Sequence, residues 1–209
     1  MPSRITPARI VSDYEAYLFG EGHWLRAWEK MGGRPAEIDG VPGYTFVVWA
    51  PNARRVSVVG DFNEWDGRLH PMRNLGASGL WELFIPRLAE GQVYKFEIEP
   101  AQGAPCLKAD PFALFAETPP RTASVTSHLG RHEWQDHAWM EARRDRGTML
   151  DAPMAIYEVH PGSWKRKPEE SNRPLTWREL AAELVPYVKT MGFTHIEFMP
   201  VMEHPFGPS

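Results

Sequence analysis

Four short segments between residues 44 and 98 constrain the fold most strongly. Each is rich in aromatic and β-branched residues and is bounded by turn residues. The segments are Tyr44–Ala50, Val56–Gly60, Leu80–Ile85 and Val93–Ile98. Strands this short and this closely spaced are typical of a small antiparallel β-sandwich.

A polar loop follows the second segment directly. Pro51-Asn52-Ala53 joins the first two segments and predicts a turn, and therefore a hairpin. The loop itself is Asp61–Gly67 (DFNEWDG), and it carries one tryptophan, Trp65. A purely solvated turn has little need for a large aromatic ring. The combination of polar groups with one flat ring therefore favours sugar binding.

The chain on either side of the sandwich follows helical patterns. Trp24, Leu25, Trp28 and Met31 are at helical spacing within residues 13–33, and Gly32-Gly33 predicts the helix end. Near the C-terminus, Met154–His160 and Thr194–Val201 are strand-like.

A helix is predicted between these two strands. Thr176 and Glu179 form a capping-box pattern at its start, and Gly192 ends the helical pattern. Pro186 inside the pattern predicts a kink or a break. A strand, a helix and a strand predict a parallel βαβ unit. A closed parallel barrel needs about 250 residues, so we expect this second domain to be incomplete in the chain.

The predicted fold class is therefore mainly β. It is an immunoglobulin-like antiparallel β-sandwich followed by the incomplete first βαβ unit of a (β/α)8 barrel. We expect an N-terminal helical segment at 1–40, the sandwich at 41–127, a linker at 128–152 and the start of the barrel at 153–209.

Composition excludes several classes of partner. The formal net charge is −4, which gives no electrostatic reason to expect binding to nucleic acid or to an anionic membrane. No apolar run approaches the roughly 18 residues that span a bilayer. Cys106 is the single cysteine, and residues 1–7 lack the apolar core of a secretory signal. We therefore expect a cytoplasmic protein with a neutral ligand.

The histidines between residues 128 and 137 do not form a metal motif. His128, His132, Glu133 and His137 are not in the order His-Glu-x-x-His, and no cysteine accompanies them. We expect neither a metal nor another cofactor. Arg143, Arg144 and Arg146 alternate with acidic residues, as is typical of a solvated helix face.

Several long motifs, in order, resemble the N-terminal region of bacterial 1,4-α-glucan branching enzymes. They are DYEAYLFGEG from Asp13, VWAPNARRVSVVGDFNEWDGR from Val48, GLWELFIP from Gly79, DPFALFAETPPRTASV from Asp110, IYEVHPGSW from Ile156 and GFTHIEFMPVMEHPF from Gly192. The resemblance implies a family 48 carbohydrate-binding module followed by a family 13 glycoside hydrolase barrel. It also implies a role in glycogen biosynthesis, by cleavage of an α-1,4-glucan and transfer of the segment to a 6-hydroxyl.

The resemblance also implies a glucan site on the sandwich. Related modules hold α-glucan with a tryptophan and a lysine at positions that match Trp65 and Lys95. Because side chains alternate along a strand, Lys95 should face outward, opposite to Tyr94 and Phe96. Asn63 is a candidate to bind sugar hydroxyls, although capping of the local turn explains it equally well. The second tryptophan of strongly binding modules is missing from the stretch PAQGAPCL at residues 100–107.

The barrel residues carry a weaker expectation. In the resembled family the catalytic carboxylates lie on later barrel strands, so we expect no catalytic residue before Ser209 and no branching activity from this chain alone. Glu203 and His204 follow a predicted barrel strand and could line a glucan groove. The expected partners are α-1,4-glucans, such as glycogen and malto-oligosaccharides, and the rest of the barrel.

Two alternatives stay open. One is a stand-alone module that binds α-glucan or only orients a barrel. The other is a debranching enzyme, because such enzymes carry a similar module. The motifs His195-Ile196-Glu197 and 202–206 (MEHPF) favour branching.

Overall fold

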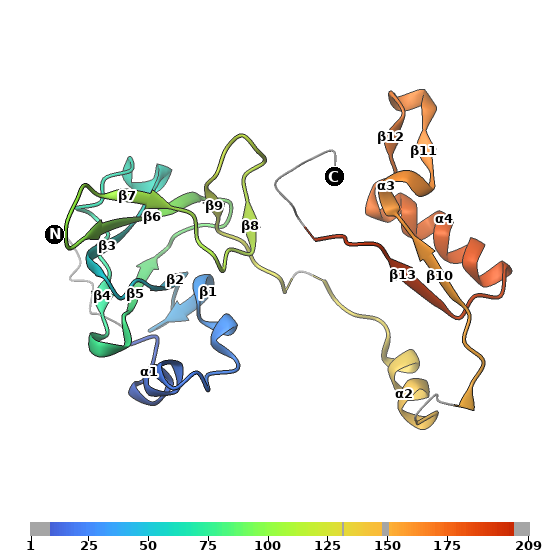
Figure 1. Cartoon of the computed structure of the whole chain (residues 1–209), viewed down its shortest axis with the longest axis horizontal. Coiled ribbons are helices and arrows are strands. Elements are labelled where there is room, and N and C mark those ends of the chain that lie inside the picture. The colour runs from blue at the N-terminus through green and yellow to red at the C-terminus, as the bar shows by residue number, and fades with distance from the viewer. Residues whose placement is uncertain (1–8, 131, 148–150, 203–209) are drawn as a thin grey trace. The chain divides into compact units, whose positions relative to one another are not determined.

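The computed structural model describes residues 9–130, 132–147 and 151–202. The chain divides into two compact units, Met1–Glu133 and Trp134–Ser209, whose elements are labelled in Figure 1.

Two antiparallel sheets form the first unit. One sheet has the order β1-β2-β5-β4, and its strands are β1 (Gly32–Ile38), β2 (Val41–Trp49), β5 (Leu80–Pro86) and β4 (Arg73–Asn74). The other has the order β3-β6-β9-β8, with β7 also paired to β6. Its strands are β3 (Ala53–Gly60), β6 (Val93–Pro100), β9 (Ser124–Val125), β8 (Phe115–Ala116) and β7 (Cys106–Lys108).

The core lies between these sheets. Phe46 of the first sheet and Val58 and Phe96 of the second are completely buried. Phe46 also meets the ring of Tyr94 edge-on, with the ring centroids 5.0 Å apart. Alternate residues of each strand therefore face the other sheet, as in a β-sandwich. The predicted fold class is confirmed for this unit.

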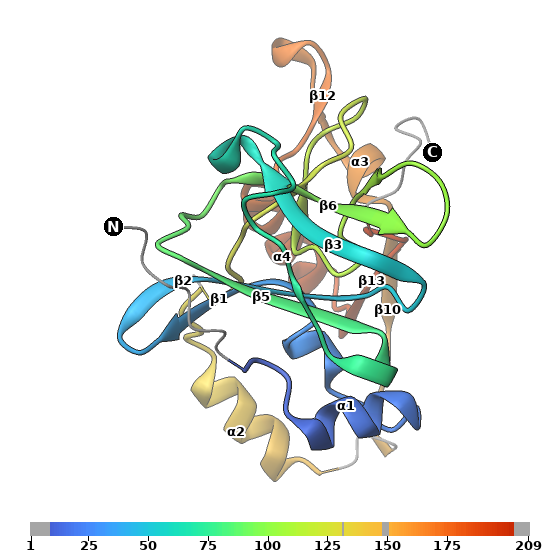
Figure 2. The ribbon, with the colours of Figure 1, turned by 90° about the vertical axis from the view of Figure 1, so that its left-hand side faces the viewer.

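The predicted hairpin is wrong. β2 pairs with β1 and β5, whereas β3 pairs with β6, which lies beside it in Figure 2. The turn at Ala50–Ala53 is present, since the Ala53 amide donates to the Ala50 carbonyl at 3.1 Å. It carries the chain from one sheet to the other. The reason is that β2 and β3 both contribute apolar side chains to one core cluster, so they face each other across it.

The segment before β1 is less helical than predicted. α1 (Asp13–Gly20) starts with a capping box between Ser12 and Glu15, and a single 3-10 turn, η1 (Ala27–Glu29), follows. Gly32, with a φ of 79°, begins β1 instead of ending a helix. Trp24, Ala27 and Met31 pack on the sheet. This packing, instead of a continuous helix, holds the segment in place.

The N-terminal segment covers the outward face of the four-stranded sheet. Val11 and Met31 form a buried cluster with Val47 of β2 and Leu80 of β5. Glu82 of β5, only 1% exposed, accepts hydrogen bonds from the amides of Ile10 at 3.1 Å and Val11 at 2.8 Å. It also forms an ion pair with Arg73. A second 3-10 turn, η3 (Gly76–Ser78), precedes β5.

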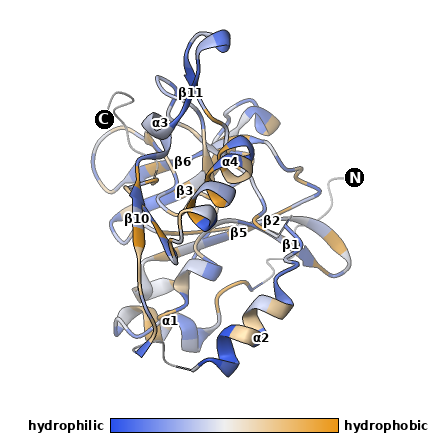
Figure 3. Cartoon of the chain, turned by 90° about the vertical axis from the view of Figure 1, so that its right-hand side faces the viewer, coloured by the Kyte–Doolittle hydropathy of each residue, from blue (hydrophilic) through white to orange (hydrophobic). Residues whose placement is uncertain are grey.

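The second unit contains the predicted βαβ arrangement. β10 (Ile156–Val159) and β13 (His195–Phe198) are parallel, and α4 (Trp177–Thr190) joins them. Val159 packs against three buried residues of α4, which are Leu180, Leu184 and Val188. Figure 3 shows the hydrophobic stretch of β10. The shorter elements are α2 (His137–Asp145), α3 (Pro161–Trp164), β11 (Arg166–Lys167), η5 (Pro168–Glu170) and β12 (Arg173–Pro174).

The ends of α4 agree with the prediction, and of the kink or break predicted at Pro186 the break is absent. The Thr176–Glu179 capping box is present, and Gly192 follows the helix with a φ of 83°. The helix is unbroken at Pro186. The buried residues on either side of this proline hold the helix on β10 and offset the lost amide donor.

Candidate functional site

The loop that carries Trp65 has an unusual backbone. A 3-10 turn, η2 (Asp61–Asn63), is followed by Glu64 and Trp65 with φ values of 54° and 60°. Positive φ is uncommon in residues other than glycine and is found where the surrounding structure enforces it. Here the Trp65 amide donates to the Gly60 carbonyl at 3.0 Å, and the Asp66 amide donates to the Asn63 carbonyl at 3.0 Å.

The buried side chain of Asn63 stabilises this loop through hydrogen bonds. Its side chain is 4% exposed. Its Oδ1 accepts from the Gly60 amide at 2.9 Å, and its Nδ2 donates to the Val58 carbonyl at 3.0 Å. Nδ2 also lies 2.9 Å from Nδ1 of His70. The structure therefore uses this amide as an internal brace of the loop, not as an exposed sugar contact.

Trp65 is partly buried. Its indole Nε1 donates to Oδ1 of Asp61 at 2.8 Å, so the ring orientation is fixed by a hydrogen bond within the loop. A fixed ring loses little conformational entropy when a ligand stacks on it.

The end of the loop rests on the outward face of the five-stranded sheet. Arg55 of β3 donates to the Gly67 carbonyl at 3.0 Å and pairs with Glu97 at 3.0 Å and with Glu99 at 2.9 Å. A Cβ on Gly67 would lie 2.0 Å from Oε1 of Glu97. Only glycine fits this close approach without movement of the neighbouring side chain.

Lys95 lies on the same outward face. It is opposite Val59 in the β3/β6 register, and its Nζ donates to Oγ1 of Thr122 at 2.7 Å. Lys95 forms no ion pair with any residue that the structure describes, because Arg54 and Arg55 pair with the nearby carboxylates of Glu97 and Glu99. Its ammonium group is therefore available to hydroxyl acceptors.

The backbone places the loop that carries Trp65 next to the strand that carries Lys95. The Trp65 amide is bonded to Gly60, and Gly60 is opposite Tyr94, the residue before Lys95. The structure thus places the loop of Trp65 beside the strand of Lys95 and buries the third predicted sandwich residue, Asn63. Glu203 and His204 lie outside the described residues.

A buried carboxylate fixes the strand that carries Lys95. Asp110 accepts from the Tyr94 hydroxyl at 2.6 Å and from the Gly33 amide at 2.9 Å. Burial and the neighbouring carboxylate of Asp110 raise the pKa of Tyr94 well above its usual range. Local sequence patterns do not predict this link, because Asp110 is 16 residues from Tyr94 and 77 residues from Gly33.

The second unit has a hollow that the sequence did not predict. It has a volume of about 490 Å³ and is lined by Trp139, Arg143, Arg146, Gly147 and His195. The Arg143 guanidinium lies 5.5 Å from the centroid of the Trp139 ring. Within the described ranges, no three His, Cys, Asp or Glu side chains are placed to hold a metal. No helix in those ranges has the length and apolar character needed to cross a membrane.

Comparison with known proteins identifies the sandwich. Residues 30–113 match the model of carbohydrate-binding module 48, also described as the isoamylase N-terminal domain. These residues are therefore similar to the family 48 carbohydrate-binding modules. Trp65 and Lys95 both lie within the matched residues.

Relatives extend the similarity to the whole chain. The 1,4-alpha-glucan branching enzyme GlgB of Rubrobacter xylanophilus is 58% identical over 209 residues, which are 100% of this chain and 28% of the relative. The enzyme of the same name from Myxococcus xanthus is 54% identical over 95% of this chain and 27% of the relative. The chain therefore spans between a quarter and a third of the length of these relatives, at their N-terminal part.

Solved structures show the same fold. The maltotriose complex of a PulA mutant from Klebsiella pneumoniae is 25% identical with a TM-score of 0.60, over 85% of this chain and 21% of that one. A putative alpha amylase from Salmonella typhimurium is 23% identical with a TM-score of 0.59, over 84% of this chain and 25% of that one.

Proposed function

We propose that this chain is the N-terminal part of a glycogen branching enzyme and that its family 48 module binds α-1,4-glucan. The observation that carries the binding proposal is the arrangement on the outward face of the five-stranded sheet. There, the Lys95 ammonium group, which has no carboxylate partner among the described residues, lies on the strand next to the loop that fixes the Trp65 ring.

This arrangement suits a neutral sugar chain. A glucose ring has an apolar face that stacks on an aromatic ring, and its hydroxyls accept hydrogen bonds from an ammonium group. Glycogen and malto-oligosaccharides offer both groups in every residue. Asn63 contributes in this proposal through the shape of the loop, because its amide already bonds to the protein.

The enzymatic role rests on the match to the branching enzymes along the whole chain. The complete enzyme would cleave an α-1,4 bond and transfer the released segment to a 6-hydroxyl. Retaining glucan chemistry needs two carboxyl groups about 5 to 5.5 Å apart, and we assign neither to a residue of this chain. Glu203 and His204 remain candidates for the groove, and the proposed compartment is the cytoplasm.

In this proposal residues 41–127 are the glucan-binding sandwich and 153–209 are the opening of a (β/α)8 barrel. Residues 1–40 are the N-terminal segment, of which Ile10–Met31 packs on the module, and 128–152 connect the two parts. The observed β1 strand, Gly32–Ile38, adds the preceding residues to the sandwich itself.

Calorimetric titration of the 209-residue chain tests the binding proposal. Maltoheptaose should bind, whereas cellohexaose, with the same sugar in β-1,4 linkage, should bind more weakly. Equal binding of both, or of neither, would contradict an α-glucan site. An assay of new α-1,6 linkages should show no branching by this chain alone.

A structural module without ligand is the second candidate. The partial burial of Trp65 favours it, because a ring packed on its own loop needs no sugar. Unretarded migration of the chain in a gel that contains amylose would support this alternative.

A further inference from the structure

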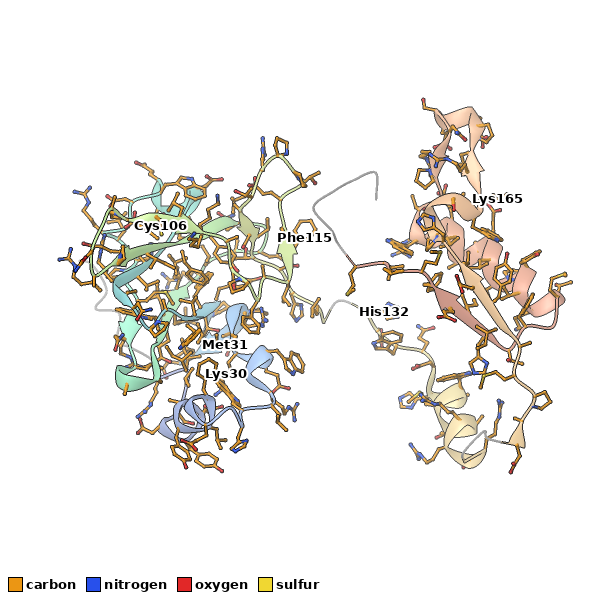
Figure 4. The ribbon with its side chains drawn as sticks, in the orientation of Figure 1. Lys30, Met31, Cys106, Phe115, His132 and Lys165 are labelled. Atoms are coloured by element: carbon orange, nitrogen blue, oxygen red, sulfur yellow. The ribbon has the colours of Figure 1, made fainter. Side chains whose placement is uncertain are left out.

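An aromatic side chain on the same sheet as Lys95 has no assigned role. Phe115 of β8 is 60% exposed, and Figure 4 shows its side chain on that strand. Exposing a phenylalanine ring forfeits most of the roughly 1.5–3 kcal/mol that its burial would contribute. An exposed ring beside a proposed ligand site therefore calls for an explanation in terms of binding.

The strand register places Phe115 on the outward face. Val93 of β6 is opposite Val125 of β9, and Val125 is opposite Phe115 of β8. Directly paired residues of antiparallel strands point to the same side. Val93 and Lys95 are two positions apart on β6, so Phe115 and Lys95 point to the same side of the sheet.

Phe115 and Val125 line a hollow of about 440 Å³. The rest of its lining comes from the turn between β8 and β9, residues 116–121 (AETPPR). The polar groups of this turn include Glu117 and Arg121, which pair at 3.5 Å. An aromatic wall with a few polar side chains at the rim is the usual composition of a small-ligand site.

One hydrogen bond links the strand segment that borders the hollow to Lys95. Lys95 donates to Thr122, the residue that follows the turn lining the hollow. Phe115 is two strands from Lys95, a lateral separation of about 10 Å at the usual strand spacing. A ligand that contacts Trp65, Lys95 and Phe115 together must therefore be an oligosaccharide, not a single sugar.

We propose that Phe115 is the second stacking platform of the module and that the hollow at the β8–β9 turn is a subsite for a further glucose residue of an α-1,4-glucan. This inference rests on the proposed glucan-binding function. It assigns to β8 the aromatic contact that residues 100–107 do not supply. Arg121 offers donors to sugar hydroxyls at the rim of the subsite.

The test compares ligands of two lengths by calorimetric titration. Phe115→Ala should weaken maltoheptaose binding about fivefold to tenfold and should change maltotriose binding by less than twofold, because the shorter ligand does not span both platforms. Phe115→Tyr keeps the ring and should retain the original affinity for maltoheptaose.

Leu107→Ala is the matched control. Leu107 is also exposed and is opposite Glu97 on the outward face, but it lies outside the hollow. This variant should bind as the unmodified chain does. The melting temperatures of all variants should agree within a few degrees, since both side chains are exposed.

The outcomes separate the two proposals. If the unmodified chain does not bind maltoheptaose, the proposed function fails. If it binds and Trp65→Ala weakens binding while Phe115→Ala does not, the site stands and the Phe115 subsite is wrong.

Discussion

The side-chain amide of Asn63 lies 2.9 Å from Nδ1 of His70. Since Oδ1 of Asn63 accepts from the Gly60 amide, its Nδ2 must supply the hydrogens for both Val58 and His70. Nδ1 of His70 is therefore an acceptor, and the ring is neutral. Phe62 meets this ring edge-on, at 5.5 Å between centroids.

This relationship predicts a pH dependence of stability. Burial lowers the pKa of His70 below its ordinary value, which is about 6.5. The unfolded state then binds the proton more readily than the folded state does. The stability that neutral His70 contributes is therefore complete above pH ~6.5, and it is lost as the pH falls through the lower pKa of the folded state. Thermal unfolding between pH 4.5 and 8 should show a smaller slope for His70→Gln than for the unmodified chain. Identical slopes would show that His70 does not titrate differently on folding.

Trp65→Ala should weaken maltoheptaose binding about tenfold, which corresponds to ~1.4 kcal/mol. The reason is the loss of a fixed stacking surface. Trp49→Ala is the control, because Trp49 is 55% exposed but lies on the other sheet. Calorimetry measures both, and an equal loss in the two variants would point to a general effect of removing a tryptophan.

Lys95→Met should lower the affinity for the same ligand by roughly threefold to tenfold, since one charge-assisted hydrogen bond is lost. Lys95→Arg keeps the charge and should lose less. Because the ligand is neutral, binding should be nearly independent of salt between 50 and 500 mM. A steep salt dependence would instead indicate an anionic ligand.

Glu82→Gln should destabilise the first unit by about 2–3 kcal/mol, because Arg73 would lose its buried partner and the amides of Ile10 and Val11 would lose a charged acceptor. Urea unfolding measures the loss. Hydrogen exchange should accelerate first at these two amides. Unchanged exchange there would show that Glu82 does not hold the N-terminal segment.

Gly67→Ala should weaken glucan binding without unfolding the chain, since the added Cβ meets Glu97 and displaces the end of the Trp65 loop. Gly20→Ala is the control, because a Cβ there meets no atom within 4 Å. The two variants should differ in maltoheptaose affinity by at least threefold, and equal affinities would mean that the loop tolerates the shift.

Much of the fold was predictable from local patterns. The four strands, the βαβ unit and the Thr176–Glu179 capping box depend on residues close in sequence, and all are present. The pairing of β2 with β3 was mispredicted because a turn reverses the direction of the chain but does not determine which sheet the next strand joins. β1 was missed because Gly32 and Gly33 are stop signals for a helix and also allow close approach to Asp110 and Tyr94.

The candidate site was predictable only in part. Trp65 and Lys95 stand out by residue type, but the burial of Asn63 depends on His70 and on β3. Phe115 lies in a proline-rich stretch without a clear pattern, and its side of the sheet follows only from its pairing with Val125. The side of the sheet on which a residue lies depends here on contacts between strands, and the sequence of a single strand does not contain that information.

The two outward faces of the sandwich differ in how well they tolerate amino-acid substitutions. On the four-stranded sheet, Val47, Leu80 and Glu82 already hold the segment that runs from Ile10 to Met31, so random substitution there would mostly select against folding. Directed evolution of a tighter or more selective glucan binder should therefore place its variable codons on β8, on the β8–β9 turn and at residue 107. The exposed positions among these include Phe115, Leu107 and residues 118–121, and sequence diversity there costs little stability.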